Sequence, residues 1–316
     1  MKKAESNHWL GNNQTGGRKN FCAVETATID RLIIKTHRLT KFPLCIHQDD
    51  EMGCYGRIIR SHAILNSRKF SIPDNICKVY NIAHSLMKFR TQINNSISKM
   101  SYSRTDKLKY NGSDQEAGNG ETKCIFIIIP MIEGVEEVSK GCVIQLPRGS
   151  KTWEKYILTF VDDKRHYVNG NHKQTSKHIL TAMVISVSSW NELLHFVGGA
   201  LKTSKCACYL IKWYFDSNDS PLMQETKETL KITMHDETEM KSTQLQPNQV
   251  TTYLGVTSQV DGNKSTHTTI LKQKAHRIRR KLNCCHMSHY YGRIHQLCFI
   301  NPKLTYPLIA SSMNKK

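Results

Sequence analysis

The sequence predicts an α+β protein, and three observations lead to this class. Several segments have the 3.6-residue hydrophobic period of helices, and short apolar runs with strand character lie between them. The two kinds of segment do not alternate in regular βαβ units. The chain of 316 residues is 39% hydrophobic, which is enough to bury a core in one large domain or in two smaller ones.

The strands and helices of the main body can be placed in order. Four apolar runs predict strands, at residues 43–47, 156–160, 166–168 and 208–215. Helical spacing of apolar residues predicts helices at residues 58–65, 73–87 and 180–194. Pro73 is typical of a first helical turn, and Gly198-Gly199 is typical of a helix end. The acidic, turn-rich segment 216–221 predicts a surface loop.

The positive charge gathers at the C-terminal end. The 45 Lys and Arg against 26 Asp and Glu leave +19, and residues 264–316 hold eleven of the Lys and Arg with no acid after Asp261. One apolar helix face is predicted there from the spacing of Leu271, Ala275, Ile278 and Leu282. A second helix is predicted over residues 288–300, stopping before Pro302. Such a basic tail favours a nucleic-acid partner, and the alternative is a solvated helix of a basic protein without a partner.

Several protein classes are excluded by composition. The longest apolar run, residues 124–132, is shorter than the ~20 residues of a membrane span. The first residues contain two lysines but no apolar core, so no signal peptide is predicted. The eleven cysteines have no repeated spacing, which indicates free thiols in a reducing compartment. We expect an intracellular protein of the nucleus or cytoplasm that is neither secreted nor bound to a membrane.

Two acidic clusters follow predicted strands. Asp162 and Asp163 come directly after the strand at 156–160, and a second strand follows, so they are predicted at a hairpin tip. Paired carboxylates repel, and a divalent cation such as Mg²⁺ removes that cost; the alternative is a plain Asp-Asp turn. Asp50 lies in the cluster after the strand at 43–47. Two strands that supply three carboxylates to two Mg²⁺ ions are typical of nucleotidyl-transfer enzymes.

The order of five segments resembles the palm of a reverse transcriptase of the retrotransposon-encoded kind. Asp50-Glu-Met-Gly-Cys-Tyr-Gly-Arg-Ile58 resembles the first catalytic box, and residues 110–119 resemble the glycine-rich Gln-Gly box. Phe160-Val-Asp-Asp163 resembles the (Phe/Tyr)-x-Asp-Asp box. Residues 190–194 and 198–206 resemble the next box and its lysine, and Tyr253-Leu-Gly-Val256 resembles the hairpin where palm meets thumb. Five boxes in one order are far more specific than any one of them.

The resemblance implies a fold, an activity and partners. Residues 1–42 would be a remnant of the fingers, residues 43–262 an antiparallel palm sheet backed by helices, and residues 263–316 a basic helical thumb. The implied activity is RNA-templated DNA synthesis with two Mg²⁺ ions, or Mn²⁺ in their place. The implied partners are an RNA template, a DNA primer and deoxynucleoside triphosphates.

The resemblance also implies roles for single residues. Asp50, Asp162 and Asp163 would hold the metal ions, and Lys205 would lie near the triphosphate as a charge stabiliser or proton donor. The incoming nucleotide would contact Tyr55, Arg57 and Gln115. The nucleic-acid backbone would contact Lys272, Lys274, Arg277, Arg279, Arg280 and Lys281.

Several positions depart from the family pattern. Gly56 replaces the second aspartate of the first box, and Asp114 and Glu116 replace the glycines beside Gln115. Two carboxylates there would repel a triphosphate. Cys124 replaces an aromatic residue and Pro130 falls inside an expected palm helix, and by the resemblance most of the fingers would be missing. The second reading is therefore a non-catalytic nucleic-acid-binding remnant of such an enzyme.

A zinc site is a further alternative. The candidate ligands are Cys206, Cys208, Cys284, Cys285, His286 and His289. Adjacent cysteines lack the Cys-x₂₋₄-Cys spacing of structural zinc sites, so buried free thiols are the favoured interpretation.

Overall fold

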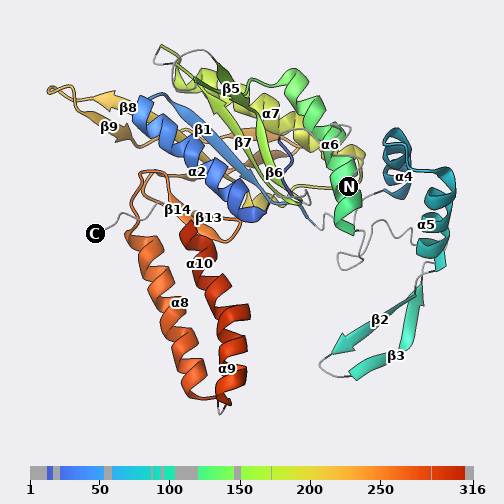
Figure 1. Cartoon of the computed structure of the whole chain (residues 1–316). Helices are drawn as coiled ribbons and strands as arrows, with labels where there is room; N and C mark the ends of the chain where they lie inside the picture. The colour runs from blue at the N-terminus through green and yellow to red at the C-terminus, as the bar shows by residue number, and fades with distance from the viewer. Residues whose placement is uncertain are drawn as a thin grey trace.

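A six-stranded sheet lies at the centre of the molecule (Figure 1). The computed structural model describes residues 13–16, 22–52, 59–86, 88–93, 96–103, 120–145, 151–171, 173–285 and 287–309. The sheet strands are β1 (Leu44–Asp49), β6 (Ile157–Phe160), β7 (Asp163–Asn169), β8 (Ala207–Phe215), β9 (Pro221–Gln224) and β12 (Thr243–Leu245). They lie in the order β12-β8-β1-β7-β6, with β9 beside β8. The α+β class is confirmed.

The four predicted strands are confirmed as β1, β6, β7 and β8. Their pairs are antiparallel, as expected. The expectation of a purely antiparallel sheet is wrong at one edge, because β12 pairs with β8 in parallel. A parallel pair needs a long crossover connection, and the chain between β8 and β12 supplies one through β9 and the hairpin of β10 (Lys231–Thr233) and β11 (Glu239–Lys241).

Helices cover both faces of the sheet. One face packs against α6 (Gly120–Val138) and α7 (Ser176–Phe196), and the other packs against α2 (Ala23–Thr40) (Figure 1). Successive side chains of a strand point to opposite faces, so Cys45 packs toward α6 and α7 while Ile46 packs toward α2. The predicted helix over 180–194 is confirmed as α7, and the positive φ of Gly198 (92°) confirms the predicted helix end.

Helix α6 contains the longest apolar run and keeps its course through Pro130. Ile125, Ile127 and Ile129 are nearly fully buried. None of the helices that the structure describes is both long and apolar enough to span a membrane.

A helical arm lies to one side of the sheet (Figure 1). It contains α4 (Arg60–Lys69), α5 (Asp74–Leu86), β2 (Lys88–Ile93) and β3 (Ser96–Ser103). The helices predicted over 58–65 and 73–87 are confirmed as α4 and α5. A further hairpin, β4 (Cys142–Gln145) with β5 (Thr152–Lys155), joins α6 to the sheet.

The N-terminal part of the chain also contacts the sheet. Ile33 and Ile34 of α2 are buried in its core, so this helix of the segment 1–42 is part of the layered body. Before α2, Thr159 of β6 donates its backbone N–H to Asn13 and accepts a hydrogen bond from that of Thr15.

The basic tail forms a pair of helical segments that projects from the sheet (Figure 1). The hairpin of β13 (Val250–Tyr253) and β14 (Val256–Gln259) leads into α8 (Ser265–Asn283), and the chain returns through α9 (His289–His295), a π-helical turn η2 (Gln296–Ile300) and α10 (Asn301–Ile309). In α8, Leu271 is buried and the other three predicted apolar residues are half-buried, which confirms the predicted face.

The prediction that the second tail helix stops before Pro302 is wrong. The chain stays helical across this proline, from α9 through η2 into α10. A proline lacks a backbone N–H and clashes with the preceding turn of an α-helix. The π-turn at residues 296–300 lies directly before the proline. Its i→i+5 hydrogen bonds widen the helix there and shift the pairing of the backbone carbonyls by one residue.

Candidate active site at the strand ends

The two acidic clusters meet at one end of the sheet. Strands β1 and β7 are antiparallel, with Asp49 opposite Lys164, so the residues one step further, Asp50 and Asp163, lie side by side. Asp162 occupies the turn of the β6–β7 hairpin, which confirms the predicted hairpin tip. The three predicted carboxylates therefore lie at the same end of the sheet, where β1 and β6 end and β7 begins, and we call this end the acidic edge.

Backbone hydrogen bonds join the segment before β8 to the chain around Asp50. The Lys202 N–H donates to the carbonyl of Asp50 at 2.7 Å, and the Met52 N–H donates to that of Ala200 at 2.8 Å. These bonds hold the short helical turn η1 (Thr203–Lys205) beside the strand end. The Nζ of Lys205 then lies 2.5 Å from Oδ2 of Asp50.

The electrostatics of the site follow from this grouping. Partial burial and the charges of Asp162 and Asp50 raise the pKa of Asp163. The hydrogen bond with Asp50, its charge and the charge of Asp163 raise the pKa of Lys205. The lysine is thus a cation held among carboxylates that repel one another.

The donor atoms suit a hard cation, since Mg²⁺ prefers carboxylate oxygens. Within the described residues, however, no group of three or more His, Cys, Asp or Glu side chains is arranged to hold a metal ion. The ammonium of Lys205 lies on Asp50 instead, so metal binding there requires that side chain to move.

A buried cluster supports the strand end from the face of α6 and α7. Asp49 Oδ1 lies 2.5 Å from Nδ1 of His47, and its Oδ2 lies 3.0 Å from Nε2 of His166. The second nitrogen of each ring lies near a serine hydroxyl, Ser242 for His47 (2.7 Å) and Ser186 for His166 (2.8 Å).

The charges of this cluster oppose the cost of burial. Burial alone raises the pKa of Asp49, but the two imidazoles outweigh it and lower that pKa strongly. Burial lowers the pKa of His47, and Asp49 reverses this and raises it. For His166, burial dominates and lowers the pKa.

A buried ion pair lies next to this cluster. Lys164 of β7 contacts Glu51, and both side chains are almost fully buried. The Nζ of Lys164 also lies 4.5 Å from the ring centre of Trp190 in α7. Of the three adjacent acids 49–51, Asp49 and Glu51 therefore form buried ion pairs, and Asp50 is the one that lies at the acidic edge.

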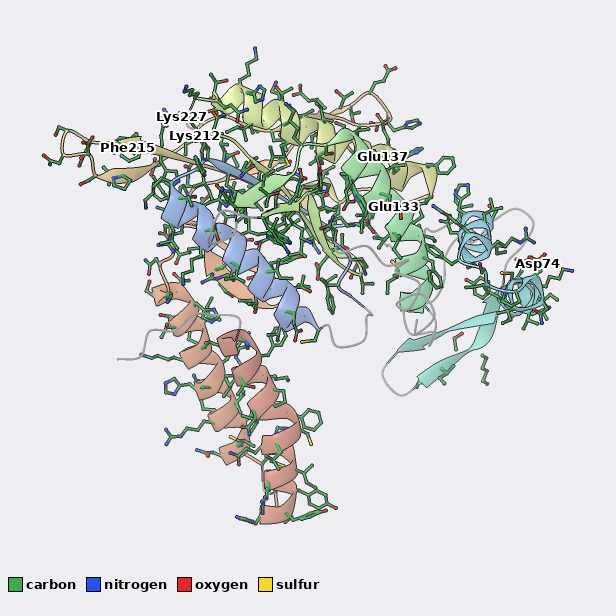
Figure 2. The ribbon with its side chains drawn as sticks, turned by 45° about the horizontal axis from the view of Figure 1, so that its top comes forward. Asp74, Glu133, Glu137, Lys212, Phe215 and Lys227 are labelled. Carbon is green, nitrogen blue, oxygen red and sulfur yellow. The ribbon has the colours of Figure 1, made fainter. Side chains whose placement is uncertain are left out.

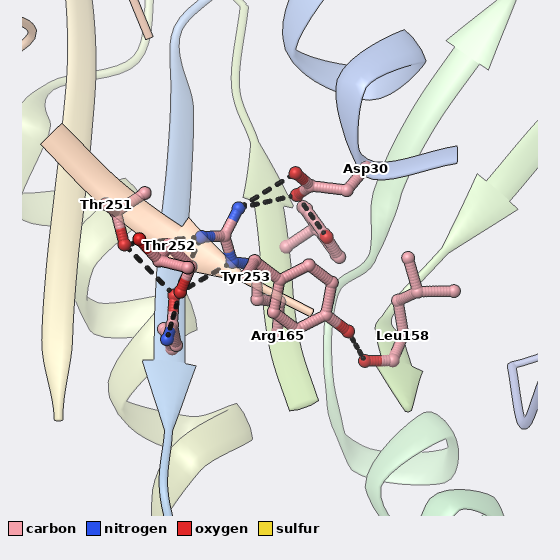
Figure 3. A network of polar contacts seen from close by, with 8 residues as sticks. Asp30, Leu158, Arg165, Thr251, Thr252 and Tyr253 are labelled. Carbon is pink, nitrogen blue, oxygen red and sulfur yellow. Dashed lines mark hydrogen bonds and ion pairs between the residues drawn. The ribbon is translucent and has the colours of Figure 1, made fainter. Parts of the chain in front are cut away.

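The opposite face carries a second buried cluster (Figure 3). Arg165 of β7 donates from Nη1 to both carboxylate oxygens of Asp30 in α2, at 2.8 and 2.9 Å. Its Nη2 donates to Oε1 of Gln48 in β1 at 2.7 Å. The hydroxyl of Tyr167 donates to Asp30 at 2.8 Å, and the ring of Tyr253 covers the guanidinium at 4.4 Å.

Sequence reasoning did not find these supporting residues. One signal was present: His47 and Asp49 alternate in β1, and Lys164 and His166 alternate in β7, so each pair shares a face. The partnership of Asp30 with Arg165 left no local signal, because the two are 135 positions apart.

Three predicted substrate residues, Tyr55, Arg57 and Gln115, lie outside the described residues, as do Gly56, Asp114 and Glu116. The six predicted basic residues of α8 are all exposed but do not form one face. Lys274, Arg277 and Lys281 line one cavity between the tail helices, and Arg279 lines a second one.

The cysteines proposed for zinc are far from one arrangement. Cys206 and Cys208 are buried in the sheet core, whereas Cys284 and Cys285 are exposed in the tail. Cys208 contacts the thiol of Cys45 at 3.5 Å. His286 lies outside the described residues.

The sequence matches no model of a known protein family, and no curated protein is detectably similar to it.

Proposed function

We propose that the chain is an RNA-templated DNA polymerase of the reverse-transcriptase kind, acting by two-metal nucleotidyl transfer to a primer 3′-end. The observation that carries the proposal is the juxtaposition of Asp50 with Asp162 and Asp163, from strands more than a hundred residues apart. The palm fold is proposed on the same basis, together with the β13–β14 hairpin that precedes the basic tail.

The residues at the edge have separate tasks in this proposal. Asp50, Asp162 and Asp163 would hold two Mg²⁺ ions, which when bound activate the primer hydroxyl and stabilise the leaving pyrophosphate. Lys205 would exchange its contact with Asp50 for the triphosphate, whose negative charge it stabilises. The buried clusters on both faces of the sheet would keep the strand ends in register.

One observation favours a second candidate function. Lys205 pairs with Asp50, and no described group of side chains is arranged for a metal ion. A non-catalytic nucleic-acid-binding protein that keeps the fold and the basic tail would have this arrangement without needing to change it.

Primer extension separates the two candidates. The full chain is incubated with a DNA primer on an RNA template, Mg²⁺ and four deoxynucleoside triphosphates. Extension that is lost in Asp163→Asn but kept in Glu137→Gln, an exposed carboxylate of α6 (Figure 2), supports the polymerase. Salt-sensitive hybrid binding without extension supports the second candidate.

The departures from the family pattern give a further test. If extension is weak, restoring the pattern with Gly56→Asp and Glu116→Gly is expected to increase it. Glu116→Gly removes a carboxylate that would repel the triphosphate, and Gly56→Asp restores the second aspartate of the first box. No gain in the double variant would locate the defect elsewhere.

A further inference from the structure

A cavity of about 640 Å³ lies between α8 and the returning segment of the tail. Its floor is apolar and includes Ile278, Leu282 and Ile300. Its volume is within the range of small-ligand sites, which is ~300–1,000 Å³. The tail therefore contains a hollow rather than a closed helix–helix interface.

The rim of this cavity is cationic. Lys274, Arg277 and Lys281 follow one another at i, i+3 and i+7 along one flank of α8, and Lys303 of α10 adds a fourth charge. Like charges at such spacing repel. In the part of the chain that the structure describes, none of these four has an acidic partner within 4.0 Å, and no acid lines the cavity. The rim is thus suited to an anion from outside.

An aromatic ring completes the wall. Phe299 of η2 lines the cavity while 54% of its surface is exposed, and the ring of His295 lies beside it at 5.2 Å. An exposed ring next to a row of cations is the chemistry that binds single-stranded nucleic acid, because bases stack on the ring while phosphates contact the cations. A base paired within a duplex is already stacked on its neighbours and cannot enter such a hollow.

We propose that this cavity binds an unpaired nucleotide of a single strand, with its base on Phe299 and its phosphates at the cationic rim. The proposal rests on the proposed function only for the choice of nucleic acid as the polyanion. It adds a site for unpaired strand that includes three of the basic residues expected to contact the backbone along α8, and that is separate from the acidic edge of the sheet.

Binding is measured on the full chain without Mg²⁺, using a fluorescent oligothymidine of about 12 nucleotides and a blunt duplex of the same length. Phe299→Ala is expected to weaken single-strand binding about 10-fold or more, the effect of one lost base stack, and to leave duplex binding nearly unchanged. Leu297→Ala is the matched control, because this neighbour is 57% exposed but does not line the cavity. Phe299→Trp should retain binding.

The lysines provide a second matched pair. Lys281→Ala should weaken single-strand binding and reduce its dependence on salt by about one phosphate contact. Lys227→Ala removes the same charge from the exposed segment between β9 and β10, outside the cavity, and should have a smaller effect. Equal effects of the two lysine variants, or equal effects of the Phe299 and Leu297 variants, would overturn the proposal.

Two arms identify the ligand and separate this proposal from the polymerase. If an acidic peptide displaces the oligothymidine and itself depends on Phe299, the site is a peptide site and the nucleotide proposal is wrong. If Phe299→Ala loses single-strand binding in a chain that extends no primer, the cavity proposal stands and the polymerase fails. If the chain extends a primer but its single-strand binding does not depend on Phe299, the polymerase proposal stands and the cavity proposal fails.

Discussion

The two faces of the sheet bury charge in different ways beneath the same edge. Toward α6 and α7, Asp49 is held between His47 and His166, all fully buried. Toward α2, Asp30 is held by Arg165. Imidazole changes charge near neutral pH, whereas guanidinium stays charged at every ordinary pH. The ion pair on the α2 face therefore keeps its charges over the ordinary pH range, whereas the charge of the cluster on the α7 face changes with pH.

The largest effect is expected on the α2 face. Arg165→Met leaves the carboxylate of Asp30 buried without its bidentate partner, and breaking a buried pair in this way costs about 3–5 kcal/mol of unfolding free energy. Urea denaturation measures it. The double variant Arg165→Met with Asp30→Asn should recover much of the loss, and a double variant as unstable as the single one would show that the charge is not the cause.

A smaller loss is expected for Asp49→Asn on the α7 face. The amide keeps the shape and one accepting oxygen but loses the charge that attracts His47 and His166, and one hydrogen bond to a charged group is worth about 1.5–3 kcal/mol. Thermal or urea unfolding tests this. Asp236→Asn, an exposed acid of a surface turn, is the control; equal losses in the two variants would contradict the assigned role of Asp49.

The pH dependence of stability distinguishes the two faces. The pKa of His47 is raised in the folded state, so its stabilisation is present below pH ~6.5 and is lost as the pH rises through the raised value. The pKa of His166 is lowered, so stability is lost as the pH falls below ~6.5 and the unfolded chain takes up the proton. Each amounts to about 1.4 kcal/mol per pH unit over its window.

Urea unfolding between pH 5 and 9 checks these signs. His47→Asn should reduce the loss on the alkaline side. His166→Asn should reduce the loss on the acid side, where His37 and His267, whose pKa values burial also lowers, account for part of the remainder. Thr251→Val, which changes the α2 face, should keep both. If His47→Asn changed the loss on the acid side and His166→Asn the loss on the alkaline side, our interpretation of which histidine carries the charge would be reversed.

The smallest effects are expected at the outer members of each cluster. Ser242→Ala removes the hydroxyl beside His47, and Thr251→Val removes the one that donates to Gln48. Each loss should be about 0.5–1 kcal/mol, measured in parallel by urea unfolding. A much larger effect of Ser242→Ala would mean that the hydroxyl sets the protonation state of His47.

Local patterns predicted what depends on neighbours in sequence. The strand before Asp162 and Asp163 was predicted because an apolar run ends at a turn pair, and the apolar face of α8 because its residues repeat at helical spacing. That Asp50, Asp162 and Asp163 meet required strand pairing, which the family resemblance supplied and the observed register brings about.

What the sequence did not predict depends on long-range contacts. Asp49 and Asp50 are adjacent and chemically identical, and only the alternation of β1 against its two faces makes one buried and the other available. The helix through Pro302 could not be foreseen, because a π-turn that accommodates a proline has no signature in residue type.

The short stretch of chain at residues 13–16 has a consequence for how the protein behaves in solution. Strand β6 is the last of the sheet, and an uncovered last strand offers its backbone groups to any other chain. Asn13 and Thr15 occupy those groups of Thr159. They thus act as a built-in shield against strand-to-strand aggregation, placed directly beside the acidic edge.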